Sequence, residues 1–170
     1  MSGKLKDWED LESSLPGAFS ARAKGFLGSE FPLSGPDGDE FGVLRLEGSG
    51  ASFEAGGTEG RIESSASKHR MFIGGEEVLT AGRDGSGGSG MSIESGGDSL
   101  EAVVSPVRNS ASARSGEGRE LVRVSGGVSN RRYEVSFEGG GLAVAVFLLY
   151  HVVSVRRRAF RAGTAAGKVK

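Results

Sequence analysis

Four arginines near the C-terminal end supply the clearest chemistry in this sequence. Arg156, Arg157 and Arg158 are consecutive, and Arg161 follows three residues later. Guanidinium groups are always charged and bind phosphate and carboxylate oxygens through several N–H donors. We therefore expect an anion- or lipid-binding site at Arg156, Arg157, Arg158 and Arg161. The alternative is structural: positive side chains at a helix C-terminus, followed by a basic tail that stays in water.

Catalytic and metal-binding chemistry is hard to assemble from the remaining residues. The two histidines, His69 and His151, fall in different predicted elements. His69 stands between Lys68 and Arg70 at the start of a strand, which predicts exposure, and His151 is typical of a core or helix-end histidine. The chain has no cysteine and no H-E-x-x-H spacing. We expect no catalytic residue, no metal site and no cofactor, and therefore no enzyme. The alternative, an enzyme whose carboxylates are dispersed along the chain, has no support in any residue pattern.

Two glycine runs have the composition of phosphate-binding loops. Residues 85–90 (GSGGSG) match the spacing G-x-G-x-x-G, but the alternating segment MSIES follows where a dinucleotide fold needs a helix. Residues 139–141 (GGG) precede an apolar run, and free N–H groups at a helix N-terminus can hold a phosphate. No Lys or Ser/Thr follows as a P-loop requires, so we expect a linker and a simple turn.

Composition and charge narrow the class of protein. The chain has 170 residues with 30 glycines and 24 serines, yet Leu, Ile, Val and Phe number 40, which indicates one folded domain with many turns. Residues 1–138 carry 15 basic and 22 acidic residues, a balance of -7, whereas residues 139–170 carry six basic and none acidic. An acidic body argues against nucleic acid as a partner, and a basic end is compatible with an anionic membrane surface.

The order of elements predicts three parts. Residues 1–39 read as an amphipathic arm and linker, with helical spacing of apolar residues within 5–27 and a turn-rich segment at 33–39. Residues 40–137 read as short alternating strands separated by glycine pairs, with flexible loops at 82–90 and 110–118. We place a barrel with a central helix at 40–158 and a basic disordered tail at 159–170.

The apolar run, Leu142–Val155, has two interpretations. As a helix it rises about 21 Å, less than the roughly 30 Å of a bilayer core, which favours a buried helix over a span. A helix that is apolar on nearly every side must be surrounded by protein, and a barrel has room for one. The fold class is therefore mainly β (α+β): a closed antiparallel β-barrel of about nine to twelve short strands around a C-terminal hydrophobic helix. The alternative is a single-pass membrane protein anchored by residues 139–155.

The same order of elements resembles the tubby C-terminal-like superfamily, above all its LURP-one-related and phospholipid-scramblase-like members. The resemblance is carried by residues 61–81 (RIESSASKHRMFIGGEEVLTA) and 133–158 (YEVSFEGGGLAVAVFLLYHVVSVRRR). It implies a closed barrel around a hydrophobic helix and, for some members, phosphoinositide binding through basic surface residues. Scramblase activity does not carry over, because an acidic calcium-binding segment beside the helix and acylated cysteines are both missing.

These observations lead to one functional expectation. We expect a non-enzymatic binding module whose partner is an anionic membrane lipid or a protein. The N-terminal sequence lacks the apolar region of a secretory signal, and the absence of cysteine fits a reducing compartment. The expected location is the cytoplasm, peripheral to a membrane; under the anchor alternative the protein is integral to it. The sequence leaves the oligomeric state open.

Overall fold

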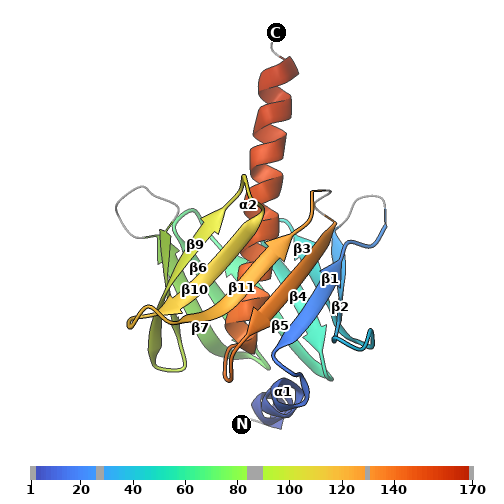
Figure 1. Cartoon of the computed structure of the whole chain (residues 1–170), viewed down its shortest axis with the longest axis vertical. Helices are drawn as coiled ribbons and strands as arrows, with labels where there is room; N and C mark the ends of the chain where they lie inside the picture. The colour runs from blue at the N-terminus through green and yellow to red at the C-terminus, as the bar shows by residue number, and fades with distance from the viewer. Residues whose placement is uncertain (1–2, 26–28, 84–89, 129–130, 169–170) are drawn as a thin grey trace.

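Twelve antiparallel strands close into a barrel around the C-terminal helix, which confirms the predicted fold class (Figure 1). The computed structural model describes residues 3–25, 29–83, 90–128 and 131–168, with the helical backbone alone at 3–5 and 159–168. Each strand pairs with its neighbours in the sequence, and the first strand closes the barrel by pairing with the last. The strands are β1 (Ala18–Arg22), β2 (Glu30–Ser34), β3 (Glu40–Glu47), β4 (Gly50–Ala55), β5 (Thr58–Ser64), β6 (Lys68–Ile73), β7 (Glu76–Arg83), β8 (Gly90–Ser95), β9 (Asp98–Ser105), β10 (Ser110–Ser115), β11 (Glu120–Gly126) and β12 (Arg132–Phe137).

Period-two alternation directs one face of each strand into the barrel. In β12, Tyr133, Val135 and Phe137 are buried while the residues between them are exposed. Glycine pairs such as Gly74–Gly75 and Gly96–Gly97 connect the strands with positive φ at both positions. Tight two-residue hairpins need that backbone conformation, since their twist must match that of the strands.

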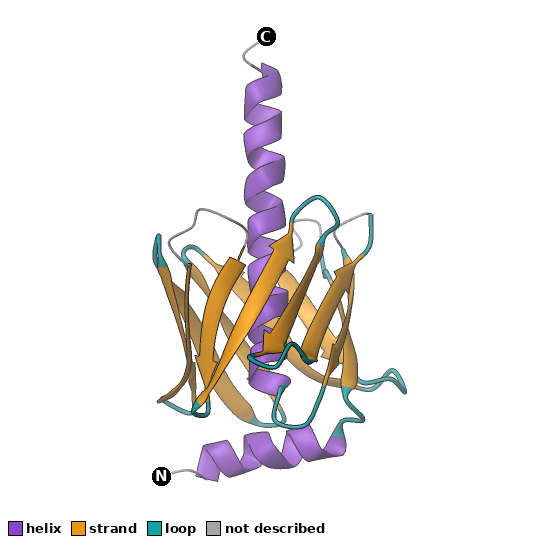
Figure 2. Ribbon diagram, turned by 60° about the vertical axis from the view of Figure 1, so that its left-hand side comes forward, coloured by secondary structure: helices purple, strands orange, loops and turns teal. Residues whose placement is uncertain are grey.

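Helix α2 (Leu142–Lys168) enters the barrel at one end and runs along its axis (Figure 2). Every residue from Leu142 to Val153 is at most 9% exposed. The strands thus surround the first twelve residues of the helix, which explains why it is apolar on all sides. These residues also form most of the segment 139–155 considered above as an anchor. Among the described residues, no helix of this protein is both long enough and apolar enough to cross a membrane.

Helix α1 (Gly3–Ser14) lies across the end of the barrel where α2 begins (Figures 1 and 2). The indole of Trp8 is 5% exposed and packs edge-on against Phe53, with ring centroids 5.7 Å apart. The backbone N–H of Leu142 donates to Glu12 Oε2 at 2.6 Å. A carboxylate of the chain itself therefore sits at the positive end of the α2 dipole. The glycines at 139–141 form a turn, in which Gly141 N–H donates to the Glu138 carbonyl.

Three segments differ from the sequence-based expectation. Within the described residues of the arm and linker expected at 1–39, a helix ends at Ser14 and the chain then supplies β1 and β2 of the barrel. The loop expected at 110–118 begins with β10, whose small residues pair with β9 and β11. The tail expected to be disordered at 159–170 continues α2 as far as Lys168, in line with the high helix propensity of its alanines. Of the loop expected at 82–90, residues 84–89 lie outside the described part of the chain.

Candidate functional site

The arginine cluster lies where α2 leaves the barrel, at the end opposite α1, which we call the barrel mouth. Because successive residues of an α-helix are about 100° apart, three consecutive arginines point in three directions. Arg156 donates to the carbonyl oxygens of Pro106 and Val107 in the turn between β9 and β10. Its guanidinium therefore anchors the helix to the rim. The backbone of Arg161 lies in α2, and its side chain is outside the described residues.

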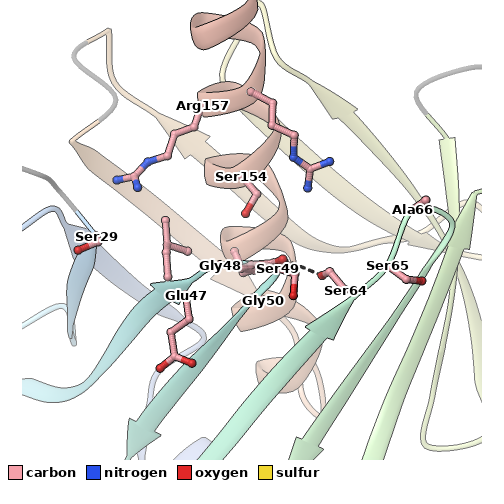
Figure 3. Close-up of a pocket in the computed structure, with 13 residues that line it drawn as sticks. Ser29, Glu47, Gly48, Ser49, Gly50, Ser64, Ser65, Ala66, Ser154 and Arg157 are labelled. Atoms are coloured by element: carbon pink, nitrogen blue, oxygen red, sulfur yellow. Dashed lines mark hydrogen bonds between the residues drawn. The ribbon is translucent and has the colours of Figure 1, made fainter.

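Arg157 and Arg158 instead line a cavity of about 610 Å³ between α2 and the neighbouring turns, which we call the mouth cleft. The Arg157 guanidinium also lies over the Phe31 ring, 5.7 Å from its centroid. Ser154 precedes both arginines by one helical turn. Figure 3 shows its side chain above Gly48 and Ser49 of the β3–β4 turn, with Arg157 extending to the side of Ser29. The remaining lining residues are Ser29, Leu46, Glu47, Gly48, Ser49, Gly50, Ser64, Ser65, Ala66 and Tyr150.

The charge of the mouth cleft is positive. Among the described residues Arg158 has no ion-pair partner, and its side chain is exposed. The one acidic lining residue, Glu47, accepts a hydrogen bond from Ser52 Oγ at 2.7 Å, and its carboxylate points away from Arg157 in Figure 3. The cleft therefore presents guanidinium and hydroxyl donors and directs its carboxylate elsewhere.

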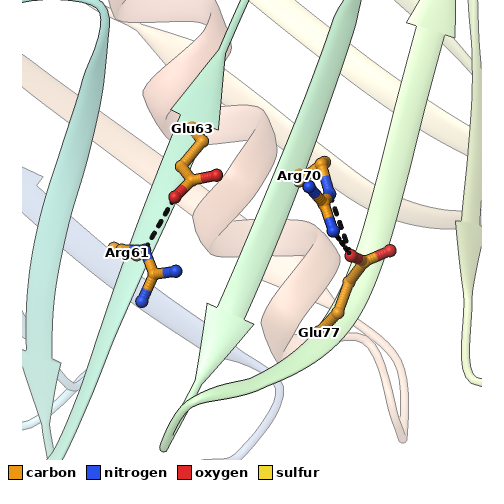
Figure 4. Close-up of polar contacts among 4 residues, drawn as sticks. All are labelled: Arg61, Glu63, Arg70 and Glu77. Atoms are coloured by element: carbon orange, nitrogen blue, oxygen red, sulfur yellow. Dashed lines mark hydrogen bonds and ion pairs between the residues drawn. The ribbon is translucent and has the colours of Figure 1, made fainter.

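Arginines on the outer wall of the barrel are in a different situation. Arg61 Nε lies 2.9 Å from Glu63, and Arg70 Nε lies 2.9 Å from Glu77 (Figure 4). Both guanidinium groups also lie over the Phe72 ring, with their central carbons 4.2 and 5.2 Å from its centroid. Charge on this wall is compensated within the sheet, which distinguishes it from the mouth cleft.

A chain of hydrogen bonds connects the cleft to the interior. Ser64 Oγ lies 2.7 Å from Tyr150 OH and 2.7 Å from His69 Nδ1. Ser64 and His69 are partners in the register of β5 and β6, and Tyr150 comes from α2. His69 is 7% exposed, with its ring centroid 5.1 Å from that of His151. The mouth cleft thus has a polar floor that ends in two buried imidazoles.

Both imidazoles are held in the neutral form. Burial lowers the pKa of His69, and the positive charges of Arg158 and Arg83 lower it further. Burial also lowers the pKa of His151, to about 3, with smaller contributions from His69, Arg158 and Arg83. Among the described residues, Nδ1 of His151 has no hydrogen-bond partner. Neither histidine therefore carries charge at neutral pH.

Sequence reasoning located the arginines but missed most of the cleft. The predicted cluster divides, since Arg157 and Arg158 line the cleft while Arg156 anchors the rim. The expected exposure of His69 is wrong. A signal was present, because His69, Met71 and Ile73 alternate with charged or half-buried residues and share the inward face of β6. Ser154 could be found from the sequence, because it shares a polar stripe of the helix with His151 and Arg158. The other cleft serines gave no signal, because they belong to turns and strand ends that meet α2 only after the barrel closes.

The described residues contain no cluster of side chains that could hold a metal ion. No group of three or more His, Cys, Asp or Glu side chains comes together there. The two histidines approach each other without a carboxylate beside them.

Comparison with known proteins supports the fold. No protein-family model matches the chain, and no curated protein does. Among solved structures, the X-ray structure of the Arabidopsis thaliana protein AT5G01750 is similar, with a TM-score of 0.61 at 13% sequence identity. The match covers 83% of this chain and 93% of the plant protein. At this identity the likeness establishes a shared barrel fold and leaves function to be argued from the site.

Proposed function

We propose that this protein is a non-enzymatic binding module that holds the phosphate of an anionic lipid headgroup in the mouth cleft, at the cytoplasmic surface of a membrane. The observation that carries the proposal is the exposed Arg158, which has no ion-pair partner in the described part of the chain and lies beside Arg157 in a cavity lined by hydroxyl groups. Charge-assisted hydrogen bonds from guanidinium groups to phosphate are among the strongest that proteins form. A cavity of about 610 Å³ is also large enough for a whole headgroup.

The direction of α2 supports a membrane surface as the location of the ligand. The helix projects beyond the barrel at the same end as the mouth cleft (Figure 2). Residues 139–170 contain six basic and no acidic residues. Basic groups near an anionic membrane contribute about 1 kcal/mol each to binding. The resemblance to the tubby C-terminal-like superfamily, including its LURP-one-related and scramblase-like members, favours the same class of ligand.

Vesicle co-sedimentation tests the proposal. The wild-type protein is expected to bind vesicles of phosphatidylcholine with phosphatidylglycerol and to leave pure phosphatidylcholine vesicles unbound. The double variant R157Q/R158Q removes two cationic groups, so its affinity is expected to fall roughly thirty-fold, which corresponds to about 2 kcal/mol.

The matched control is R114Q/R119Q, which removes the same charge at the opposite end of the barrel. Arg119 Nη2 pairs there with Glu138 Oε2 at 2.5 Å, and Arg114 lies 4.0 Å from Glu120. Exposed pairs of this kind contribute at most about 1 kcal/mol to stability, so the control should fold and bind as the wild type does. Equal losses in both double variants would mean that net charge alone drives binding. That result, or equal binding to both vesicles, would reject the cleft as the site.

A further inference from the structure

Ser64 occupies the junction between the mouth cleft and the buried histidines. Its Oγ lies 2.7 Å from Tyr150 OH on the cleft side and 2.7 Å from Nδ1 of His69 on the interior side. Ser64 and Tyr150 both line the cleft, whereas His69 is 7% exposed and does not. A ligand in the cleft can therefore touch both hydroxyl groups, but it reaches His69 only through Ser64.

The positions of the protons along the hydrogen bonds of Tyr150, Ser64 and His69 decide which hydroxyl group can donate to a ligand in the cleft. Each hydroxyl has one proton, and neutral imidazole has one N–H and one lone pair. With the lone pair of His69 on Nδ1, Ser64 donates to His69 and accepts from Tyr150, so both hydroxyl protons point inward. When Nδ1 carries a proton, it must donate to Ser64. The Ser64 proton then turns toward Tyr150 or the cleft, and in either case one hydroxyl proton becomes available to a ligand.

We propose that His69 is a positioning residue for the mouth cleft: it takes up a proton when a phosphate binds, and the Ser64–Tyr150 hydroxyl pair turns a donor toward that phosphate. The proposal rests on the proposed function and adds its regulation by pH. Protonation of His69 has two effects that favour phosphate binding. It places a positive charge behind the two hydroxyl groups, and it reverses the direction of their hydrogen bonds. The one covalent change is the N–H bond formed at Nδ1 of His69, whose proton comes from the bulk solvent.

Charged and titratable groups act on His69 from α2 and β7, and β5 contributes the neutral Ser64 beside it. Arg158 and His151 belong to α2, and Arg83 belongs to β7. These three are cationic or can become so, and no carboxylate contributes among them. Burial, Arg158 and Arg83 keep the pKa of His69 low in the empty protein. A phosphate on Arg158 opposes the field of that arginine, so it raises the pKa of the imidazole.

The sign of the effect follows from linkage. If ligand binding raises the pKa of His69, the complex binds more protons than the free protein, and affinity increases as pH falls. One coupled proton sets an upper limit of about tenfold in affinity for each pH unit. The phosphodiester of phosphatidylglycerol serves as the probe, because it has no second ionisation and keeps a constant charge from pH 5.5 to 7.5.

The experiment measures binding to phosphatidylglycerol vesicles at pH 5.5, 6.5 and 7.5 and constant ionic strength. The wild-type dissociation constant is expected to decrease by about tenfold from pH 7.5 to 5.5. In H69N the side-chain amide can still bond Ser64 but cannot take up a proton, so affinity is expected to change by less than about twofold over the same range. H151F removes the other histidine and is expected to retain the wild-type pH dependence.

A second measurement avoids the variants. Histidine titration by NMR, with and without soluble dimethyl phosphate, is expected to show an increase in the pKa of His69 when the phosphodiester is present. An increase with dimethyl phosphate means that the free phosphodiester suffices. An increase with phosphatidylglycerol nanodiscs alone means that the ligand must be part of a membrane.

The outcomes separate the two proposals. Binding to vesicles that does not change with pH, or an H69N protein that keeps the pH dependence, would overturn the role of His69 and leave the cleft in place. Failure to bind at every pH would reject the proposed function as well. If H69N does not fold, S64A removes the hydroxyl that turns toward the ligand and leaves the charge of His69 in place. The pH dependence of binding is then expected to become smaller, and an unchanged pH dependence in S64A would overturn the relay through Ser64.

Discussion

Acid should destabilise this protein partly through His151, whose imidazole is buried inside the barrel and makes the larger contribution of the two histidines. The ring is 9% exposed and stacks on Phe147, with centroids 5.8 Å apart and planes 17° from parallel. Burial is the largest reason that its pKa is lowered to about 3; the neighbouring His69 and the arginines at positions 158 and 83 add to it. Protonation in the folded state would place an unsatisfied cation among apolar side chains.

The magnitude follows from the difference between the folded and unfolded pKa values. In the unfolded chain the imidazole has its ordinary pKa of about 6.5, so below that pH the unfolded state binds more protons than the folded state. The stabilisation is complete above the unfolded value and is lost as pH falls below it. Between pH 7 and pH 5, His151 alone should lower the free energy of unfolding by about 2 kcal/mol.

The assay is urea unfolding of the wild type and H151F at pH 7, 6 and 5. Phenylalanine keeps the stack on Phe147 and has no proton to gain, so H151F should lose about 2 kcal/mol less than the wild type between pH 7 and pH 5. The difference between the two pH dependences is the relevant quantity, because the larger ring can cost about 1–3 kcal/mol at every pH through overpacking. Parallel pH curves for the two proteins would refute the reasoning, since they would mean that the folded protein accommodates a protonated His151.

Two further predictions concern packing at the end of the barrel closed by α1. G60A should destabilise the protein by several kcal/mol, because a Cβ at Gly60 would lie 2.1 Å from the Phe53 ring, which Trp8 holds in place. Thermal unfolding checks this, with the exposed turn residue Gly116 changed to Ala as the control. Equal melting temperatures of the two variants would contradict the prediction. E12A should lower the free energy of unfolding by about 1–2 kcal/mol, because it removes the carboxylate that accepts a hydrogen bond from Leu142 N–H at the α2 N-terminus. The control changes the nearby exposed Glu9 to Ala. An equal effect of both changes would argue against a specific role for the hydrogen bond.

The local sequence pattern was insufficient to predict the two N-terminal strands, β1 and β2. Segment 18–22 (AFSAR) follows a helix and is only five residues long, so its alternation was too short to separate from helical spacing. Strand β2 contains Pro32, which cannot donate to a neighbour and is usually read as a break. The structure tolerates it because β1 and β2 pair through only two residue pairs, Ser20 with Ser34 and Ala21 with Leu33.

The helix boundary was missed for a related reason. The three arginines after Val155 looked like the end of a helix, since positive charge is favourable there. In the structure α2 continues through them to Lys168, because Arg156 is held by the carbonyls of the β9–β10 turn and the following alanines favour helix. A contact between residues about fifty positions apart cannot be seen in local sequence.

Local sequence by itself determined the barrel and the helix within it. Alternation with a period of two requires strands buried on one face, glycine pairs turn them back on themselves, and the apolar run Leu142–Val155 needs an enclosure. It also pointed to arginine as the residue type at the proposed site. Only the tertiary structure decided which arginines face the mouth cleft, that His69 is buried, and that Ser64 joins it to Tyr150. The reason is physical: strand register and helix rotation determine which side chains meet, and both depend on packing of the whole barrel.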